Sequence, residues 1–184
     1  MNRFRRFSFG FLILTAMLFS LTFMASCSQN RSASTRRLTM KILKNMRYRL
    51  GWADRTVKLT NGVYEGIPPG MIGRWRTEIY DGMHAFGDIN NDGVMDAVLV
   101  MRSSGGGSGM FISLEAIINN NGVPKHIASV LLGDRVHVKS LSIKSGIIII
   151  DMLTHGPSDP MCCPTVETIH KYKFNKGKLV RYRG

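Results

Sequence analysis

The residues best suited to chemistry form an acidic segment near the middle of the chain. From position 88 to 96, oxygen-bearing side chains alternate with other residues, and a glycine stands at the sixth position. This spacing lets carboxylate, amide and main-chain oxygens converge on one hard cation, and calcium prefers such ligands. An Asn-Asp-Gly sequence is also an excellent hairpin turn, so a turn held by hydrogen bonds without metal is the alternative. The predicted calcium ligands are the side chains of Asp88, Asn90, Asp92 and Asp96 and the main-chain carbonyl of Val94.

This segment differs from an EF-hand. Position 12 of the motif is Leu99, where an EF-hand needs a bidentate glutamate, and the residues at 97–101 have the apolar pattern of a strand. The segment therefore resembles the strand-flanked calcium loops of FG-GAP and related extracellular repeats. With calcium or as a metal-free turn, we expect a structural role for this segment ahead of a catalytic one.

A second reactive segment covers residues 154–165 and contains two adjacent cysteines among three prolines. An oxidising compartment would tend to pair these cysteines, although neighbouring α-carbons lie about 3.8 Å apart, closer than in ordinary disulfides. Strained disulfides are the more easily reduced ones. A structural lock is the favoured interpretation, and a redox or ligand site and a soft-metal site are the alternatives. The residues in question are His155, Asp159, Met161, Cys162 and Cys163.

The N-terminus has the pattern of a secretory signal. A basic run at 1–6 precedes an uncharged stretch at 7–25 that is rich in Phe, Leu and Met. Ala25 and Ser26 directly precede Cys27, which resembles a bacterial lipobox. The resemblance implies a lipoprotein signal peptide at 1–26 and a palmitate-bearing membrane anchor at Cys27. Ser28, in place of Asp, favours the outer membrane facing the periplasm in a cell that has one. An ordinary cleaved signal peptide and an uncleaved membrane helix are the alternatives.

The chain is basic, with 25 Lys and Arg against 12 Asp and Glu and a formal net charge of +13. Anionic lipid headgroups and acidic cell-wall polymers are therefore candidate envelope partners, and a merely solvated basic surface is the alternative. We expect no nucleic-acid partner in this compartment. The polar composition of residues 27–37 predicts a tether between the anchor and the folded part.

Residues 38–184 predict one β-rich domain. Apolar residues at helical spacing predict a short amphipathic helix at 38–50, and frequent turn sequences after it predict a single antiparallel β-sheet, so the fold class is mainly β. Half-buried strands are predicted at 110–118 and 166–174, and a central strand at 147–153. A shift in the apolar alternation predicts a bulge near Lys139 and Ser140.

Four segments, at 59–65, 87–93, 130–135 and 154–165, together resemble a family of uncharacterised bacterial secreted or lipoprotein domains, most specifically in the Asp-Pro-Met-Cys-Cys-Pro run. The resemblance implies an envelope location and one folded unit, and no reaction. We expect a cell-envelope lipoprotein that acts as a binding or structural module with a calcium-stabilised loop. The alternatives are a redox or hydrolytic enzyme using the segment from His155 to Cys163, and an inhibitor of wall-degrading enzymes. Enzymatic activity stays open, and no catalytic residue is predicted, because neither a Gly-x-Ser-x-Gly elbow nor a His-Glu-x-x-His motif occurs.

Overall fold

The computed structural model describes residues 37–51 and 53–183. The chain separates into two units between Ser34 and Thr35, and the description below concerns the second unit alone. The predicted signal peptide, Cys27 and nearly all of the predicted tether lie outside the described residues. Within the described residues, no helix is long and apolar enough to cross a membrane.

The second unit is mainly β and antiparallel, as predicted, but its strands form three sheets and not one. The smallest sheet pairs β1 (Arg47–Leu50) with β2 (Arg55–Lys58). The five-stranded sheet follows chain order: β3 (Val63–Gly66), β4 (Trp75–Gly87), β5 (Asp96–Ser104), β6 (Phe111–Asn120) and β7 (Val123–Asp134). The four-stranded sheet does the same: β8 (His137–Lys144), β9 (Ile147–Thr154), β10 (Val166–Asn175) and β11 (Lys178–Arg181).

Two-residue turns close three of the hairpins and explain the sequential pairing. In each turn both residues have positive φ, for example 51° at Asn121 and 89° at Gly122 between β6 and β7. Such turns match the right-handed twist of the flanking strands and favour Asn and Gly. The turn sequences therefore predicted these hairpins correctly; the other two are Ser145-Gly146 and Lys176-Gly177.

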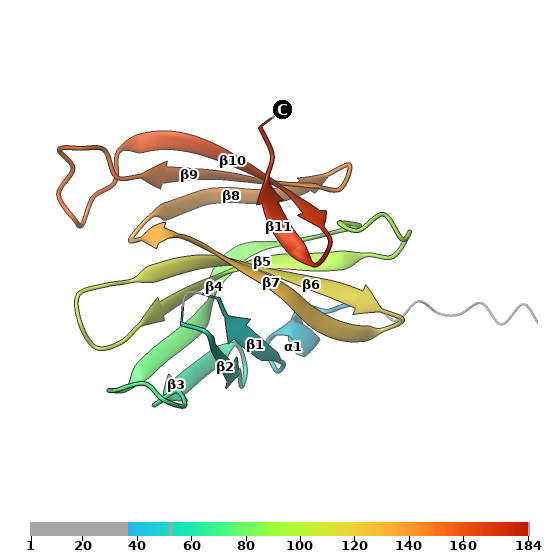
Figure 1. Cartoon of the computed structure of the whole chain (residues 1–184), viewed down its shortest axis with the longest axis horizontal. Helices are drawn as coiled ribbons and strands as arrows, with labels where there is room; N and C mark the ends of the chain where they lie inside the picture. The colour runs from blue at the N-terminus through green and yellow to red at the C-terminus, as the bar shows by residue number, and fades with distance from the viewer. Residues whose placement is uncertain (1–36, 52, 184) are drawn as a thin grey trace, which may run out of the picture. The chain divides into compact units, whose positions relative to one another are not determined.

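Two hydrophobic cores lie on opposite faces of the five-stranded sheet. Figure 1 shows the elements that cover these faces, the four-stranded sheet on one side and β1 with β2 on the other. One face packs against the four-stranded sheet, where Val98 and Leu114 meet Ile148 and Ile150. The other face packs against residues 38–59, which include β1 and β2. Strands β5 and β6 are buried on both faces, so the continuous apolar pattern of β5 is that of a central strand. Because both cores lie within the second unit, a form of the chain beginning at Ser28 keeps every contact described here.

The predicted helix at 38–50 is not confirmed. The structure has only a four-residue helix, α1 (Met40–Leu43), capped by the Thr39 hydroxyl, and the last four residues of the predicted helix form β1. Tyr48 and Leu50 are buried while Arg47 and Arg49 are exposed, which is the two-residue period of a strand. The spacing of the basic residues is compatible with a helix and with a strand. In the structure, pairing with β2 makes this segment a strand.

Other strand predictions hold in part. Strand β9 lies between β8 and β10, as predicted, and the register between β8 and β9 shifts from Val138 to Ser140, where the bulge was predicted. In β10, Tyr172 lies on the buried face and Ile169 on the exposed face. The strand predicted at 110–118 is present as β6, but β6 is buried on both faces and not half-buried.

Candidate functional site

The predicted calcium loop connects β4 to β5 and is held together by its own hydrogen bonds. The Asp88 Oδ1 atom accepts from the backbone N–H groups of Asn91 (2.7 Å) and Asp92 (3.2 Å), and its Oδ2 accepts from Gly93 (2.9 Å). Desolvation works against ionisation, but these backbone donors outweigh it and lower the pKa of Asp88. The Asp88 carboxylate thus organises the turn as an ionised group.

Asp96 sits at the start of β5 with none of its surface exposed. Its Oδ2 accepts from the Ile89 N–H (3.1 Å) and its Oδ1 from the Asn119 N–H (2.9 Å), which fastens the loop to the end of β6. Burial raises the pKa of Asp96, while these two N–H groups favour its charged form. Asp96 therefore acts in this structure as a buried clamp.

The remaining predicted ligands lie in the same turn. Asn90 donates to the Asp92 Oδ2 (2.8 Å), and the Asp92 Oδ1 accepts from the Val94 N–H (2.8 Å). Over residues 37–51 and 53–183, no group of three or more His, Cys, Asp or Glu side chains is gathered as a metal site. The geometry is that of the hydrogen-bonded turn, the alternative that the sequence left open, and calcium binding stays a prediction.

The second predicted segment connects β9 to β10 and contains a disulfide between Cys162 and Cys163, both exposed. Asp159 organises this loop: it accepts from the Gly156 N–H (2.8 Å) and from both the N–H (2.8 Å) and the hydroxyl of Thr165. The Gly156 N–H leads the interactions that lower the pKa of Asp159, and the Thr165 donors add to it against desolvation.

The other two residues of this segment differ from each other in exposure. Met161 is 59% exposed. Both ring nitrogens of His155 are buried and lack a hydrogen-bond partner within the described residues. The sequence thus placed all five residues in one loop, and the structure assigns its internal bonding to Asp159 and the disulfide.

The two predicted sites do not share a cleft. The turn between β8 and β9 contacts the calcium loop, since a Cβ added at Gly146 would lie 3.2 Å from Asn91, whereas the disulfide loop follows the other end of β9. From Ile147 to Thr154 a strand extends about 23 Å at 3.3 Å per residue. The two loops are therefore separate structural features.

A pocket of about 330 Å³ lies beside the disulfide loop. Its floor is apolar, with Ile112 (3% exposed) and Val136 (7% exposed) from the core and Met110 at the entrance. Cys162 and Pro164 form part of the wall. The disulfide loop thus borders a hollow to which β4, β5, β6 and the connection from β7 to β8 also contribute.

Two arginines and other polar groups line the same pocket. The Arg135 Nε donates to the Ser108 carbonyl (2.7 Å) and its Nη1 to the Met161 carbonyl (3.2 Å), which ties both neighbouring loops to the β7–β8 connection. Arg102 lies 5.6 Å above the Tyr80 ring. Sequence reasoning missed these residues, because they are far apart in the chain and belong to no motif.

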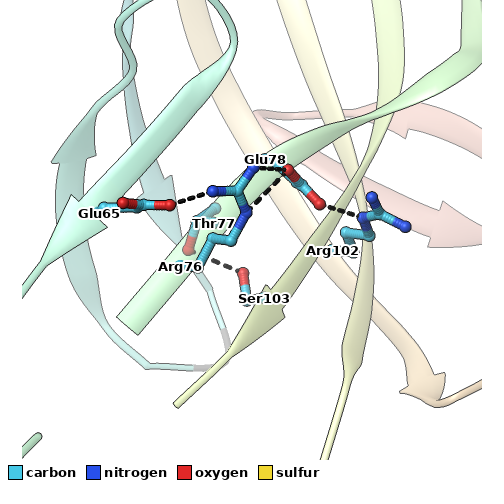
Figure 2. Close-up of polar contacts among 6 residues, drawn as sticks. All are labelled: Glu65, Arg76, Thr77, Glu78, Arg102 and Ser103. Atoms are coloured by element: carbon cyan, nitrogen blue, oxygen red, sulfur yellow. Dashed lines mark hydrogen bonds and ion pairs between the residues drawn. The ribbon is translucent and has the colours of Figure 1, made fainter. Parts of the chain in front are cut away.

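Arg102 ends a chain of ion pairs on the five-stranded sheet (Figure 2). One carboxylate oxygen of Glu78 accepts a hydrogen bond from the Arg102 Nε. The other accepts hydrogen bonds from the Nε (3.0 Å) and Nη2 (2.6 Å) of Arg76. Arg76 also contacts Glu65 on β3. Alternating charges across β3, β4 and β5 thus hold the Arg102 guanidinium in place.

A buried polar cluster joins the small sheet to the five-stranded sheet. Glu115 is fully buried and accepts from Ser113 (2.6 Å), Ser129 (2.9 Å) and the His126 Nε2 (2.8 Å). The His126 Nδ1 accepts from the Arg49 N–H (3.2 Å), so its proton is on Nε2. Neither histidine nitrogen is free to act as a base, and the cluster is structural.

Comparison with protein-family models, with curated proteins and with solved structures finds no match to this chain. The family resemblance inferred from the sequence stays a prediction, and the site is interpreted from its geometry.

Proposed function

We propose that the chain is a cell-envelope lipoprotein, anchored through acylated Cys27, whose β domain is a binding module for a small molecule. The observation that carries the proposal is the pocket beside Cys162, with its apolar floor and two arginines. Ligand sites combine an apolar lining with a few convergent polar groups, and about 300 Å³ is the lower end of their size range. The pocket therefore suits a ligand of roughly a dozen heavy atoms.

A redox or hydrolytic enzyme using the segment from His155 to Cys163 is the second candidate. The exposure of both cysteines favours it, because a disulfide must be accessible for thiol exchange. It ranks lower because the Asp159 carboxylate is committed to the Gly156 and Thr165 donors of its own loop. An inhibitor of wall-degrading enzymes ranks last, since only location and size favour it.

We also propose that the loop from Asp88 to Asp96 binds calcium. Its support is the concentration of oxygen donors in one turn, with Asn90 already in contact with Asp92 (2.8 Å). Binding would require Asp88 to share its oxygens between the cation and the backbone N–H groups that it now accepts. The ion would stabilise the connection between β4 and β5.

The pocket can be tested by blocking it. At roughly 0.3 kcal/mol per heavy atom, a probe of about twelve heavy atoms binds with a millimolar Kd. We expect 4-phenylbutyrate, and more weakly 4-phenyl-1-butanol, to shift the methyl NMR signals of Ile112 and Val136 in the chain beginning at Ser28. Ser108→Trp places a large ring at the pocket wall and should abolish these shifts.

The matched control is Gly107→Trp, one residue away, where an added side chain points into open space. This variant should respond like the parent. Absence of shifts with both probes in the parent, or an unchanged response in Ser108→Trp, would contradict the binding-module proposal.

A further inference from the structure

We propose that the ligand of the pocket beside Cys162 is an amphipathic organic anion, whose carboxylate or phosphate head pairs with Arg102. The apolar body of the ligand lies over Ile112 and Val136 on the pocket floor. This inference rests on the proposed binding function and names the chemical class of the ligand.

Arg102 is held in an orientation that suits an anion. Its Nε donates a hydrogen bond to Glu78, and its Cζ lies 5.6 Å from the centroid of the Tyr80 ring. Figure 2 shows the two Nη nitrogens of Arg102 on the side away from Glu78. A guanidinium presents its donors as a planar fork that matches a carboxylate or phosphate, so this edge can form a bidentate pair. Because Arg102 is already oriented, little side-chain entropy is lost on binding.

The charge around the pocket favours a negative ligand. Arg102 and Arg135 line it, and no Asp or Glu among the described residues does so. Glu78, which does not line the pocket, is shared between Arg102 and Arg76, and Arg76 also pairs with Glu65. The net charge of the whole chain, +13, has the same sign.

Arg135 has a different role from Arg102. Its Nε and Nη1 already donate to the carbonyls of Ser108 and Met161, and its Nη2 lies 3.6 Å from Asp134. Arg135 therefore supports the two loops that form the wall. Arg102, with 44% of its side chain exposed, is the arginine that can turn an edge to a ligand.

The apolar floor selects against small anions that carry little or no apolar surface. Among the apolar lining residues, Met110 exposes 36% of its surface, while Ile112 and Val136 expose only 3% and 7%, and only an apolar group removes this hydrocarbon surface from water. An anion without an apolar body would pair with the Nη edge of Arg102 but gain nothing from the floor. Acetate is therefore the appropriate weak-binding comparison.

The experiment titrates 4-phenylbutyrate, 4-phenyl-1-butanol and acetate into the chain beginning at Ser28, with the Ile112 and Val136 methyl signals as the readout. We expect the acid to bind about tenfold or more tightly than the alcohol, because a hydrogen-bonded charge pair contributes that much. Arg102→Gln should reduce affinity for the acid by about tenfold and leave the alcohol unchanged.

Arg74→Gln is the matched control, since it removes one positive charge from an exposed residue near the β5–β6 hairpin that does not line the pocket. It should bind all three probes like the parent. Equal affinity for acid and alcohol in the parent, or equal losses in Arg102→Gln and Arg74→Gln, would overturn the anion assignment while leaving the pocket as a binding site. Failure of every probe to bind would overturn the binding module itself.

Discussion

The Asp88→Asn substitution tests how the loop between β4 and β5 is stabilised. In the parent, the Asp88 carboxylate accepts three backbone N–H groups, two on Oδ1 and one on Oδ2. Asparagine keeps one acceptor oxygen and points an NH₂ group at the donor on the other side. The variant therefore loses at least one charge-assisted hydrogen bond and the charge that strengthens the others. A hydrogen bond to a charged group contributes about 1.5–3 kcal/mol, and water reaches this half-buried turn, so we expect a loss of about 1–2 kcal/mol.

The assay is urea denaturation of the chain beginning at Ser28, with EDTA present so that no cation contributes. Asp81→Asn is the control, because it removes the same charge from an exposed side chain in β4. We expect the control to stay within about 0.5 kcal/mol of the parent. If Asp88→Asn also stays within that range, the hydrogen bonds of the loop do not stabilise the fold and the reasoning is refuted.

Acidity supplies an independent check on the same residue. Desolvation opposes ionisation, yet the N–H groups of Gly93, Asn91 and Asp92 lower the pKa of Asp88 below its usual 3.8. A lowered pKa in the folded state contributes stability above the unfolded value and loses it as pH falls through the folded value. The stability difference between the parent and Asp88→Asn should therefore narrow below about pH 4. A difference that is constant down to pH 2 would exclude ionised Asp88 as its source.

Two further predictions concern calcium and the anchor. Millimolar calcium should raise the Tm of the chain beginning at Ser28 relative to EDTA, by the equivalent of about 2.7 kcal/mol at a hundredfold excess over Kd, and Asp92→Ala should remove most of the rise. Superimposable melting curves of the parent in calcium and in EDTA would contradict calcium binding. Palmitate label should enter the full chain in bacterial cells and disappear in Cys27→Ala, and label that survives the substitution would contradict the anchor.

Features encoded within a few neighbouring residues could be predicted from the sequence. The turns Asn121-Gly122 and Ser145-Gly146 carry positive φ at both positions, and the side chains needed for that geometry are visible in the sequence. The bulge between Val138 and Ser140 was predictable for the same reason, since one extra residue shifts the apolar alternation. Local chemistry determines these features, and the structure confirms them.

Features that depend on packing could not be predicted. An apolar run such as that of β5 indicates that the strand is buried on both faces, but it does not show which elements cover each face. The same apolar pattern is therefore expected for a single covered sheet and for the arrangement of three sheets found here. The segment at 38–50 carries apolar residues that fit a helix, and pairing of Tyr48 and Leu50 with β2 overrides that fit. Burial of these two side chains against β5 and β6 stabilises the strand more than helix propensity could stabilise the helix.

The candidate site shows the same division. The sequence identified the cysteine loop by its motif, but Arg102 and Tyr80 reach the pocket only because β4 and β5 are neighbours, and Arg135 only because the chain passes from one sheet to the other there. A rigid loop of prolines and a disulfide has no binding function by itself. Beside an oriented arginine and the exposed edge of a core, it becomes one wall of a pocket with a charged end and an apolar floor. The chemistry of the proposed site therefore belongs to residues that no sequence motif connects, and the motif contributes the surface against which they act.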